Sequence, residues 1–579
     1  MTDHGHPHDH DEPTPADQRA ADLSIPDEDL SPRELSRRDF LRGLGVLGVA
    51  AGAAGLGILP TSLVSPRTAR ASSDAARAAV ETPSAAHIDP DSLRWLAGDH
   101  HIHTQFSSDA QYRVADQVGH ALENDLDWLV ITDHGRVAHE KVGIDRTNTD
   151  ILAARAAHRD ALVFQGLEWN IPGAEHGTVF LAPGAYEKDI LHAFEASYDG
   201  VAVYGSGATA NDAVHEAKAI EAINFLSAQV AAGRSSAALF LANHPARRGL
   251  DSPHEIRAWN DADPSIAVGF EGAPGHQAAG IAVADGGPGS ARGFYDFSPL
   301  ADSHPGYPLE AYRTHGGFDW MTARVGGLWD SLLAEGRRWW ITANSDSHAV
   351  YHDTMVRGAG NGQFDNPASP NFGAYGDPVD TGVPVNGNGD FWPGYYSRTV
   401  VGATHRGYRS VMAAIAAGRM WVCHGELIRS LDARVTVPGA FRGMETTLGG
   451  TAVVRHGDEV HVRIEIGLPR RPNHAGVVPR LRRVDLIAGP VTGAASDRDT
   501  LGAPATQVVQ SFDIGRSDGR IVLDYRFRNV RESFYLRIRG TDGNVSAPGS
   551  IEPRLDPVPM DPWTDLWFYS NPIFVRVGR

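Results

Sequence analysis

The sequence predicts an α/β barrel followed by a smaller all-β domain. Two observations predict the barrel: short apolar runs alternate with helix-like stretches, and polar residues follow the apolar runs in nearly every case. In a parallel α/β barrel these positions converge on one face, at the carboxyl ends of the strands, where active sites form. The all-β domain is predicted by apolar–polar alternation in segments such as VHVRIEIGL at 460–468.

Length and composition limit the classes of function. A chain of 579 residues is too long for one small core, so two or more domains are expected. The net charge of −19 argues against nonspecific binding to nucleic acid or to an anionic membrane. The single cysteine, Cys423, excludes an internal disulfide framework.

Residues 1–71 are predicted to be a twin-arginine export signal, followed by a linker over residues 72–93. The segment SRRDFL contains the pair Arg37 and Arg38, and it precedes a glycine-rich apolar run that ends in the cleavage-like ARA at 69–71. A membrane anchor is the alternative, but so much glycine disfavours stable insertion. We therefore expect export by the twin-arginine translocase to an extracellular or cell-envelope location, without a stable membrane anchor.

The barrel is expected over residues 94–430. After the segment GDHHIHTQFSSDA at 98–110, strands are predicted at DWLVITDHG (127–135), ALVFQGLEWN (161–170), HGTVFLAP (176–183), ALFLANHPARRG (238–249) and RRWWITANSDSHAV (337–350). Helices are predicted at 113–126, 213–233 and 327–336. The Gly-, Pro- and Asn-rich stretch 353–394 is expected to be a lid loop over a site, and the β-sandwich-like domain is expected over residues 431–579.

The residues at the strand ends predict a metal centre. They are His101, His103, Asp109, His134, Glu168, His176, His244, Asp346 and His348. Mixed nitrogen and oxygen ligands without a thiolate favour zinc, manganese or iron, and nine ligands are enough for two or three divalent ions. Such a centre can activate a bridging water and hold both the attacking and the leaving oxygen of a displacement.

These motifs resemble the PHP (polymerase and histidinol phosphatase) family of metal-dependent phosphoesterases. The motifs that carry the resemblance are D-x-H-x-H-T (Asp99–Thr104), ITDH (Ile131–His134), G-x-E (Gly166–Glu168), HP (His244–Pro245) and D-x-H (Asp346–His348). The resemblance spans residues 95–430 and implies a distorted seven-stranded, TIM-like (β/α)7 barrel with up to three metals. The β-domain and the terminal YSNPIFVRV are similar to a branch that includes carbaryl-hydrolase-like metallohydrolases.

Three residues are expected to act in catalysis. Arg247 and Arg248 directly follow the HP element and could clamp a substrate anion, although they could instead only solvate a loop. Glu168 stands at the G-x-E position, where the resemblance implies a carboxylate that joins two metals. Glu271 and His276 follow another strand end and are candidates for contact with the ligands or the substrate.

We expect an exported metal-dependent hydrolase, a phosphoesterase in which a metal-bridging hydroxide attacks a small-molecule phosphate ester. Two alternatives stay open. One is a carboxylic or carbamic ester hydrolase with the same metal site. The other is a non-catalytic, extracytoplasmic, metal-loaded binding module that works through its β-domain. An amidohydrolase barrel also begins with H-x-H but often uses a lysine between its metals, and no lysine follows a strand here.

Overall fold

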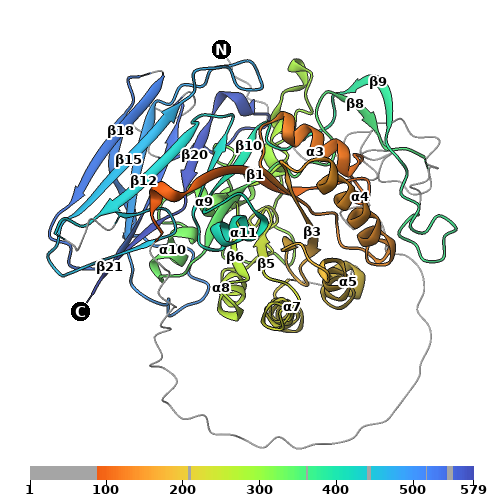
Figure 1. Ribbon diagram of the computed structural model, residues 1–579, viewed down its shortest axis with the longest axis horizontal. Helices are drawn as coiled ribbons and strands as arrows, with labels where there is room; N and C mark the ends of the chain where they lie inside the picture. The colour runs from red at the N-terminus through yellow and green to blue at the C-terminus, as the bar shows by residue number, and fades with distance from the viewer. Residues whose placement is uncertain are drawn as a thin grey trace, which may run out of the picture. The chain divides into compact units, whose positions relative to one another are not determined.

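A mixed sheet forms the first part of the fold (Figure 1). The computed structural model describes residues 88–205, 210–359, 363–439, 445–516, 518–543 and 552–578. The predicted export signal and residues 72–87 of the predicted linker therefore lie outside the described residues. Within the described residues, no helix has both the length and the apolar character needed to cross a membrane.

Seven strands of this sheet follow one another in chain order. They are β1 (Arg94–Ile102), β2 (Trp128–Ile131), β3 (Leu162–Asn170), β4 (His176–Leu181), β5 (Ala238–Ala242), β6 (Ala267–Ala273) and β7 (Trp340–Ala343). β10 (Ser397–Ala403) and β11 (Met420–His424) extend the sheet beyond β1 through antiparallel pairs. The described strands show no ladder between β7 and β1, and a single parallel bridge joins Ile102 to Ser347.

β4 runs against its neighbours. The pairs β1–β2, β2–β3, β5–β6 and β6–β7 are parallel, but β4 is antiparallel to both β3 and β5. The cause is the short connection between β3 and β4, because a parallel return needs a crossover of a dozen or more residues. The first residue of β4, His176, is therefore paired with the last residue of β3, Asn170, and lies at the same sheet edge as the carboxyl ends of the other strands.

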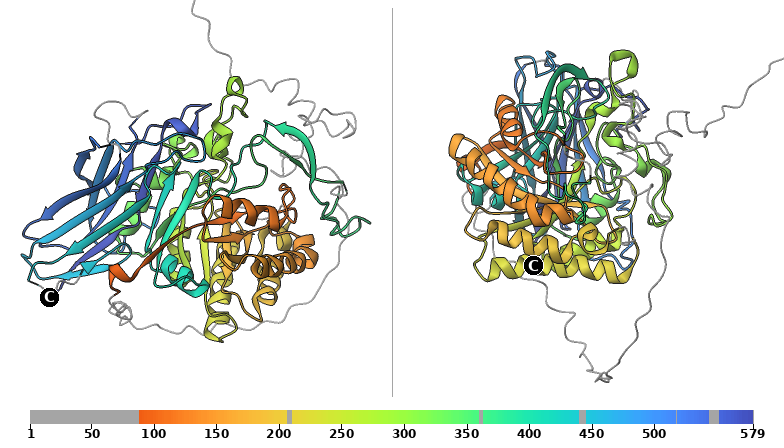
Figure 2. Two further views of the ribbon diagram at one scale, coloured as in Figure 1. Left: turned by 45° about the horizontal axis from the view of Figure 1, so that its top comes forward. Right: turned by 90° about the vertical axis from the view of Figure 1, so that its right-hand side faces the viewer.

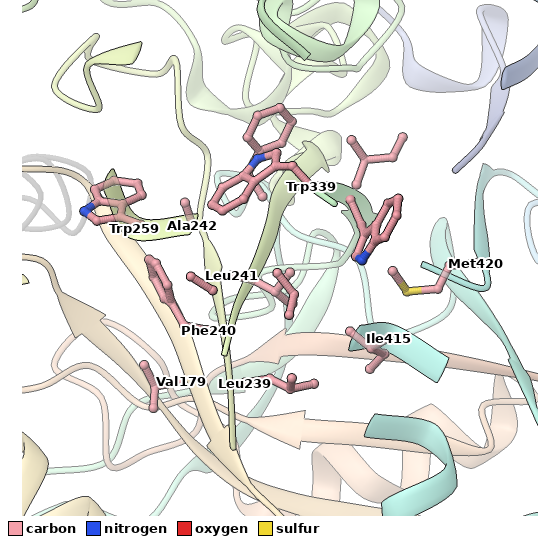
Figure 3. Close-up of a cluster of buried hydrophobic side chains, with 14 of the residues drawn as sticks. Val179, Leu239, Phe240, Leu241, Ala242, Trp259, Trp339, Ile415 and Met420 are labelled. Carbon is pink, nitrogen blue, oxygen red and sulfur yellow. The ribbon is translucent and has the colours of Figure 1, made fainter. Parts of the chain in front are cut away.

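Helices cover the sheet and form a core with it. They are α3 (Val114–Glu123), α4 (Ile144–Ala157), α5 (Glu187–Tyr198), α6 (Gly200–Tyr204), α7 (Ala213–Ala231), α8 (Pro253–Ala262), α9 (Trp320–Ala323), α10 (Leu328–Ala334) and α11 (Tyr408–Ala416). Every residue of β5 is buried, as expected for a strand covered on both faces. Figure 3 shows Phe240 and Leu241 of β5 among Val179, Trp259 and Ile415, which come from a strand and two helices.

Two packed sheets form the C-terminal part. One contains β12 (Ser430–Thr436), β13 (Glu445–Thr446), β15 (Val460–Leu468) and β18 (Gly519–Phe527). The other contains β14 (Thr451–Val454), β16 (Arg483–Pro490), β17 (Gln507–Asp513), β19 (Phe534–Thr541), β20 (Trp567–Ser570) and β21 (Ile573–Val577). Val462 and Ile464 share a buried cluster with Leu486 and Ile538, so the alternating residues of the two sheets face a common core.

The second of these sheets is continuous with the first part of the fold. β20 pairs antiparallel with β11, which joins all of these strands except β12, β13, β15 and β18 into one sheet. Figures 1 and 2 show the blue C-terminal strands and the orange-to-yellow helices α3–α5 at opposite ends of the described unit. The predicted boundary at 430 stays a prediction.

The predicted lid stretch 353–394 contains two strands. β8 (Asp353–Val356) pairs antiparallel with β9 (Val379–Val385), and residues 360–362 lie outside the described ones. The lack of apolar periodicity led to the expectation of a loop, because both strands are exposed or half-buried along their length. A role of this segment as a lid stays a prediction.

Candidate metal centre

The H-x-H motif directs two imidazole rings toward the same point. His101 and His103 are two residues apart at the end of β1, so strand alternation turns both side chains to one face. The Nδ1 atom of His101 lies 2.6 Å from Glu271 Oε1, and that of His103 lies 2.8 Å from Ser107 Oγ. Their Nε2 atoms are only 2.9 Å apart. Two imidazole nitrogens this close, with both Nδ1 atoms already in contact with other side chains, are well placed to bind one cation together.

His100 turns the other way, into the interior. Its Nε2 atom lies 2.8 Å from Thr342 Oγ1 and its Nδ1 atom 3.3 Å from Thr178 Oγ1. Burial lowers the pKa of His100 to about 3, so this imidazole is neutral. The adjacent carboxylate of Asp99 accepts from the backbone N–H groups of His101 and Ser345, and thereby ties the end of β1 to the segment after β7.

Glu168 is the hub of the centre. Five imidazole nitrogens lie within ion-pair distance of its two oxygens: His101 at 3.2 Å, His103 at 3.2 Å, His134 at 2.9 Å, His176 at 3.1 Å and His244 at 3.3 Å. The side chain is 1% exposed. Burial alone would raise the pKa of Glu168, but the surrounding imidazoles outweigh it and hold the pKa well below its usual range. Glu168 is therefore a carboxylate that can bridge two cations.

Asp346 is the second shared carboxylate. Its Oδ1 atom lies 3.0 Å from His101 Nε2, 3.2 Å from His103 Nε2 and 3.4 Å from His348 Nδ1. Asp346 and His244 both have positive φ, 47° and 32°, directly after β7 and β5. Non-glycine residues seldom adopt this backbone conformation, and it concentrates at functional sites.

Asp109 and His348 complete the set on its outer side. Asp109 Oδ2 lies 3.3 Å from His134 Nε2, and its Oδ1 lies 3.6 Å from His348 Nε2. The side chain of Asp109 is 51% exposed, whereas most of the other eight are buried. All nine residues selected from the strand ends thus gather around Glu168 and Asp346. Their roles as metal ligands stay predictions.

The residues present fit a group of divalent cations. Ligand atoms within 4.8 Å of one another form overlapping sets: His101, His103, Glu168 and Asp346; His103, Asp109, His134 and His348; His134, Glu168 and His176; Glu175, His176 and His244. The buried atoms Glu168 Oε2 and Asp346 Oδ1 have no hydrogen-bond donor in the described part of the chain. Carboxylate oxygens that face only imidazole nitrogens are well placed to ligate a transition metal.

Several residues at this site were not singled out as site residues from the sequence. Glu175, in the β3–β4 connection, lies 3.6 Å from His244 Nδ1. Asp390, in the predicted lid stretch, accepts from the backbone N–H of His348 at 2.6 Å and lies 2.5 Å from His276 Nδ1. Glu175 could have been found from its place next to His176. Asp390 could not, because it follows no strand of the main sheet.

Glu175 also fixes both arginines. Arg247 Nη2 lies 3.3 Å and Arg248 Nε 3.8 Å from its carboxylate. Burial alone would raise the pKa of Glu175, but the two guanidinium groups outweigh it and hold the pKa at about 2. The negative charge of Glu175 therefore lies beside the positive charges of Arg247 and Arg248. The three side chains together carry a net charge of +1. The predicted anion clamp stays a prediction, with one of its two charges neutralised by Glu175.

The two candidates after β6 contact the centre through its ligands. Glu271 lies against His101, as described above, and its Oε2 accepts from the backbone N–H of His244 at 2.7 Å. His276 Nε2 lies 2.7 Å from Asp346 Oδ2. Both residues are therefore placed to orient ligands.

Residues 99–216 match the PHP domain family. The matched stretch includes His101, His103, Asp109, His134, Glu168 and His176. His244, Asp346 and His348 lie outside it and join the same centre through the fold. No curated protein matches the chain.

Two solved structures are similar to the chain. One is a two-domain protein containing a predicted PHP-like metal-dependent phosphoesterase from Bacteroides vulgatus ATCC 8482. It is 13% identical, the match covers 79% of this chain and 93% of that chain, and the TM-score is 0.29. The other is a proposed metal-dependent phosphoesterase from Bifidobacterium adolescentis ATCC 15703. It is 13% identical, with 30% and 76% covered and a TM-score of 0.17.

Proposed function

We propose that the protein is an exported metal-dependent phosphoesterase. The observation that supports this best is the Glu168 hub, where one buried carboxylate contacts five imidazoles and Asp346 shares two of them. Residues 99–216 match the PHP domain family, and the resemblance of the sequence motifs to that family implies metal-dependent hydrolysis of phosphate esters. We also propose that β1 to β7 form the distorted seven-stranded barrel, with the Ile102–Ser347 bridge at its seam.

The nine side chains would hold two or three divalent ions of zinc, manganese or iron. When bound, these ions would supply Lewis acidity and an activated water nucleophile. Glu271 and Ser107 fix the rings of His101 and His103 so that both Nε2 atoms face inward. Glu168 keeps its negative charge because the imidazoles depress its pKa, and it is therefore available to bridge.

The chain itself would bind the charged substrate. Arg247 is largely buried, and its Nε has no hydrogen-bond partner among the described residues. Glu175 holds its Nη2, so the guanidinium is oriented before any substrate arrives. A guanidinium held in this way can donate hydrogen bonds to a phosphate oxygen and stabilise charge that develops on it.

One observation favours a second candidate, hydrolysis of a carboxylic or carbamic ester. Glu175 lies beside both arginines and cancels one of their charges, so the site holds less positive charge than the sequence alone suggests. An uncharged ester needs no such excess. The same activated water could attack a carbonyl carbon, and this would agree with the resemblance to carbaryl-hydrolase-like enzymes.

The deciding experiment compares substrates and a hub variant. Wild type and Glu168→Gln are assayed on p-nitrophenyl phosphate, p-nitrophenyl acetate and an aryl carbamate, with metal content measured in both proteins. Glu168→Gln should lose about 10²-fold or more in kcat, since losing a group that stabilises the transition state costs ~2.7–4 kcal/mol. Glu221→Gln, the same change on an exposed position of α7, is the matched control.

The outcomes separate the proposals. Turnover of the phosphate ester alone supports the phosphoesterase, and turnover of the acetate or carbamate alone supports the second candidate. Equal turnover by Glu168→Gln at equal metal content would refute the hub mechanism. A metal-loaded protein that hydrolyses none of the three would favour the binding module.

Export is proposed from the sequence, because residues 1–71 lie outside the described ones. The test is replacement of Arg37 and Arg38 by lysine in the full chain. The precursor should then stay in the cytoplasm, and unchanged export of this variant would contradict the twin-arginine route.

A further inference from the structure

A second histidine cluster lies outside the Glu168 centre. It combines His254, the second residue of α8, with His304, which precedes the 3-10 turn Leu309–Tyr312, and Asp499, in the β16–β17 connection. Each offers a ligand atom, and these atoms lie within 4.8 Å of one another. His254 Nδ1 lies 2.6 Å from Asp499 Oδ1, and the two imidazole centroids are 6.2 Å apart. Three segments far apart in the sequence thus bring metal-binding side chains together.

His304 supplies the second imidazole of the cluster. The residue is 8% exposed, and no hydrogen bond joins its ring nitrogens to any described residue. Neither ring nitrogen is among the fully buried polar atoms that lack a partner, so a metal ion there would replace water at the ring.

His254 is oriented by a carboxylate on its far nitrogen. Glu216, in the first turn of α7, has Oε1 at 3.3 Å from His254 Nε2. The ring therefore donates to two carboxylates, to Asp499 from Nδ1 and to Glu216 from Nε2. A metal ion would take the place of the Nδ1 proton, while Glu216 would keep the proton on Nε2. This is the carboxylate–histidine–metal arrangement in which a partner fixes both tautomer and ring orientation.

We propose that His254, His304 and Asp499 form a zinc site, with Glu216 as its positioning residue. Two imidazoles and one carboxylate without a thiolate are a typical zinc donor set, whereas calcium takes oxygen ligands. A tetrahedral ion with bonds of about 2.0–2.1 Å needs ligand atoms roughly 3.3 Å apart, so the His254–Asp499 contact would open modestly. Asp499 is 44% exposed, which leaves room for water at the fourth position.

The site would connect the C-terminal sheets to the loop that carries the predicted anion clamp. The backbone N–H of His304 donates to Gly249 O at 2.8 Å, and Ser303 Oγ donates to Arg248 O. On the other side, Arg257 of α8 donates to the carbonyls of Arg498 and Thr500, which flank Asp499. Zinc would therefore fasten the segment after Arg248 to α8 and to the β16–β17 connection. This inference does not rest on the proposed hydrolase activity.

The test counts zinc on the full chain. Wild type, His254→Asn, Asp499→Asn and Asp497→Asn are dialysed against Zn²⁺, and bound zinc per chain is measured. Asp497 is the matched control, because it belongs to the same turn and asparagine can still accept the backbone N–H of Asp499. Wild type and Asp497→Asn should bind one more zinc ion per chain than the other two variants. Glu216→Gln should lower the affinity for this zinc ion by about 10–100-fold without abolishing its binding.

A second measurement does not depend on variants that fold. Crystals of the wild-type chain grown with Zn²⁺ should show anomalous scattering within about 2.0–2.2 Å of His254 Nδ1, a His304 nitrogen and Asp499. Zinc there without zinc at Glu168 would support this inference and count against the proposed function. Equal zinc content in all four proteins, or no anomalous peak at the cluster, would overturn it.

Discussion

At the scale of single residues, the orientation of the imidazoles is set by what contacts the ring nitrogen that faces away from the centre. Glu271 contacts two ligating residues at once: Oε1 meets His101 Nδ1, and Oε2 accepts from the backbone N–H of His244. Both oxygens therefore face donors. An amide in its place would turn an NH2 group toward one of them.

We expect Glu271→Gln to weaken metal binding by about 10–100-fold, the usual effect of losing a partner that orients a ligand. Activity on the best substrate should recover when more metal is supplied, because the nine predicted ligands remain. The measurement is turnover against free metal concentration, with Glu221→Gln as the control. A loss that added metal does not restore would assign Glu271 a role in the reaction itself.

A second residue-scale feature is the Asp565 carboxyl, which is 1% exposed. Its Oδ1 accepts from Trp567 Nε1 at 2.9 Å, and its buried Oδ2 has no partner among the described residues. Burial raises the pKa of Asp565 to about 7, and nearby Asp556 adds to the shift. The carboxyl is therefore protonated in the folded protein at pH values where the unfolded chain has lost that proton.

Between about pH 4 and pH 7 the folded state holds one proton more than the unfolded state, so stability falls as the pH rises through this window. At 1.36 kcal/mol per pKa unit, the loss is on the order of 4 kcal/mol above pH 7. Asp565→Asn keeps the acceptor for Trp567 and carries no charge. We expect its free energy of unfolding to fall less between pH 5 and pH 8 than that of wild type or of the exposed Asp561→Asn. Parallel pH profiles would contradict this.

At the scale of elements, β1 and β2 approach each other closely at Gly98. A Cβ at this position would lie 2.0 Å from Trp128 Cε2, and Trp128 is fully buried. Any side chain must push the indole aside or part the two strands. Because His101 and His103 follow on β1, a shift there would reach the candidate metal centre.

Gly98→Ala should lower the free energy of unfolding by about 1–3 kcal/mol, the usual cost of overpacking a core. Gly119→Ala makes the same change inside α3, where a Cβ meets nothing within 4 Å. That variant should be neutral or more stable, since alanine favours a helix over glycine by roughly 0.5–1 kcal/mol. Urea unfolding of both variants checks the difference in sign. A stable Gly98→Ala would show that β1 and β2 can separate at little cost.

The positions of strands and ligands were largely predictable, but their directions and outer contacts were not. Apolar runs that are followed by His, Asp or Glu predicted β2, β3, β5 and β7, because a strand buried on both faces has a continuous apolar sequence. The reversal of β4 was not predicted, although its cause, the short connection between Asn170 and His176, can be read from the sequence. Asp390 was missed because hydrogen bonding across 41 or 42 residues leaves no local pattern.

At the scale of the whole molecule, the first part of the fold and the C-terminal sheets share hydrogen bonds and buried charge. β20 covers the edge of β11, and Arg537 of β19 forms two 2.8 Å hydrogen bonds with Asp330 of α10, both side chains fully buried. Removal of residues 431–579 would leave Asp330 without its cation and β11 with an open edge. An unpaired buried charge costs about 3–5 kcal/mol, and an open strand edge favours aggregation.

We therefore expect a chain that ends at residue 430 to be insoluble or aggregated under conditions where the full chain is soluble. Soluble yield and sedimentation of the two proteins check this. A monomeric, folded fragment would show instead that the first part is stable by itself.

The continuity of the sheet also constrains how the protein is made. β1 pairs with β10 at Gly98 and Thr399, about 300 residues apart. β11 pairs with β20, where Trp421 lies opposite Ser570. Pairing between such distant segments is slow, because the entropy cost of closing a long loop comes before the stabilising contacts can form. β1 cannot pair with β10 until residue 403 has been synthesised, and β11 cannot pair with β20 until residue 570 has been synthesised. Until then the growing chain exposes open strand edges, so folding should follow release from the ribosome and should depend on protection from aggregation during synthesis.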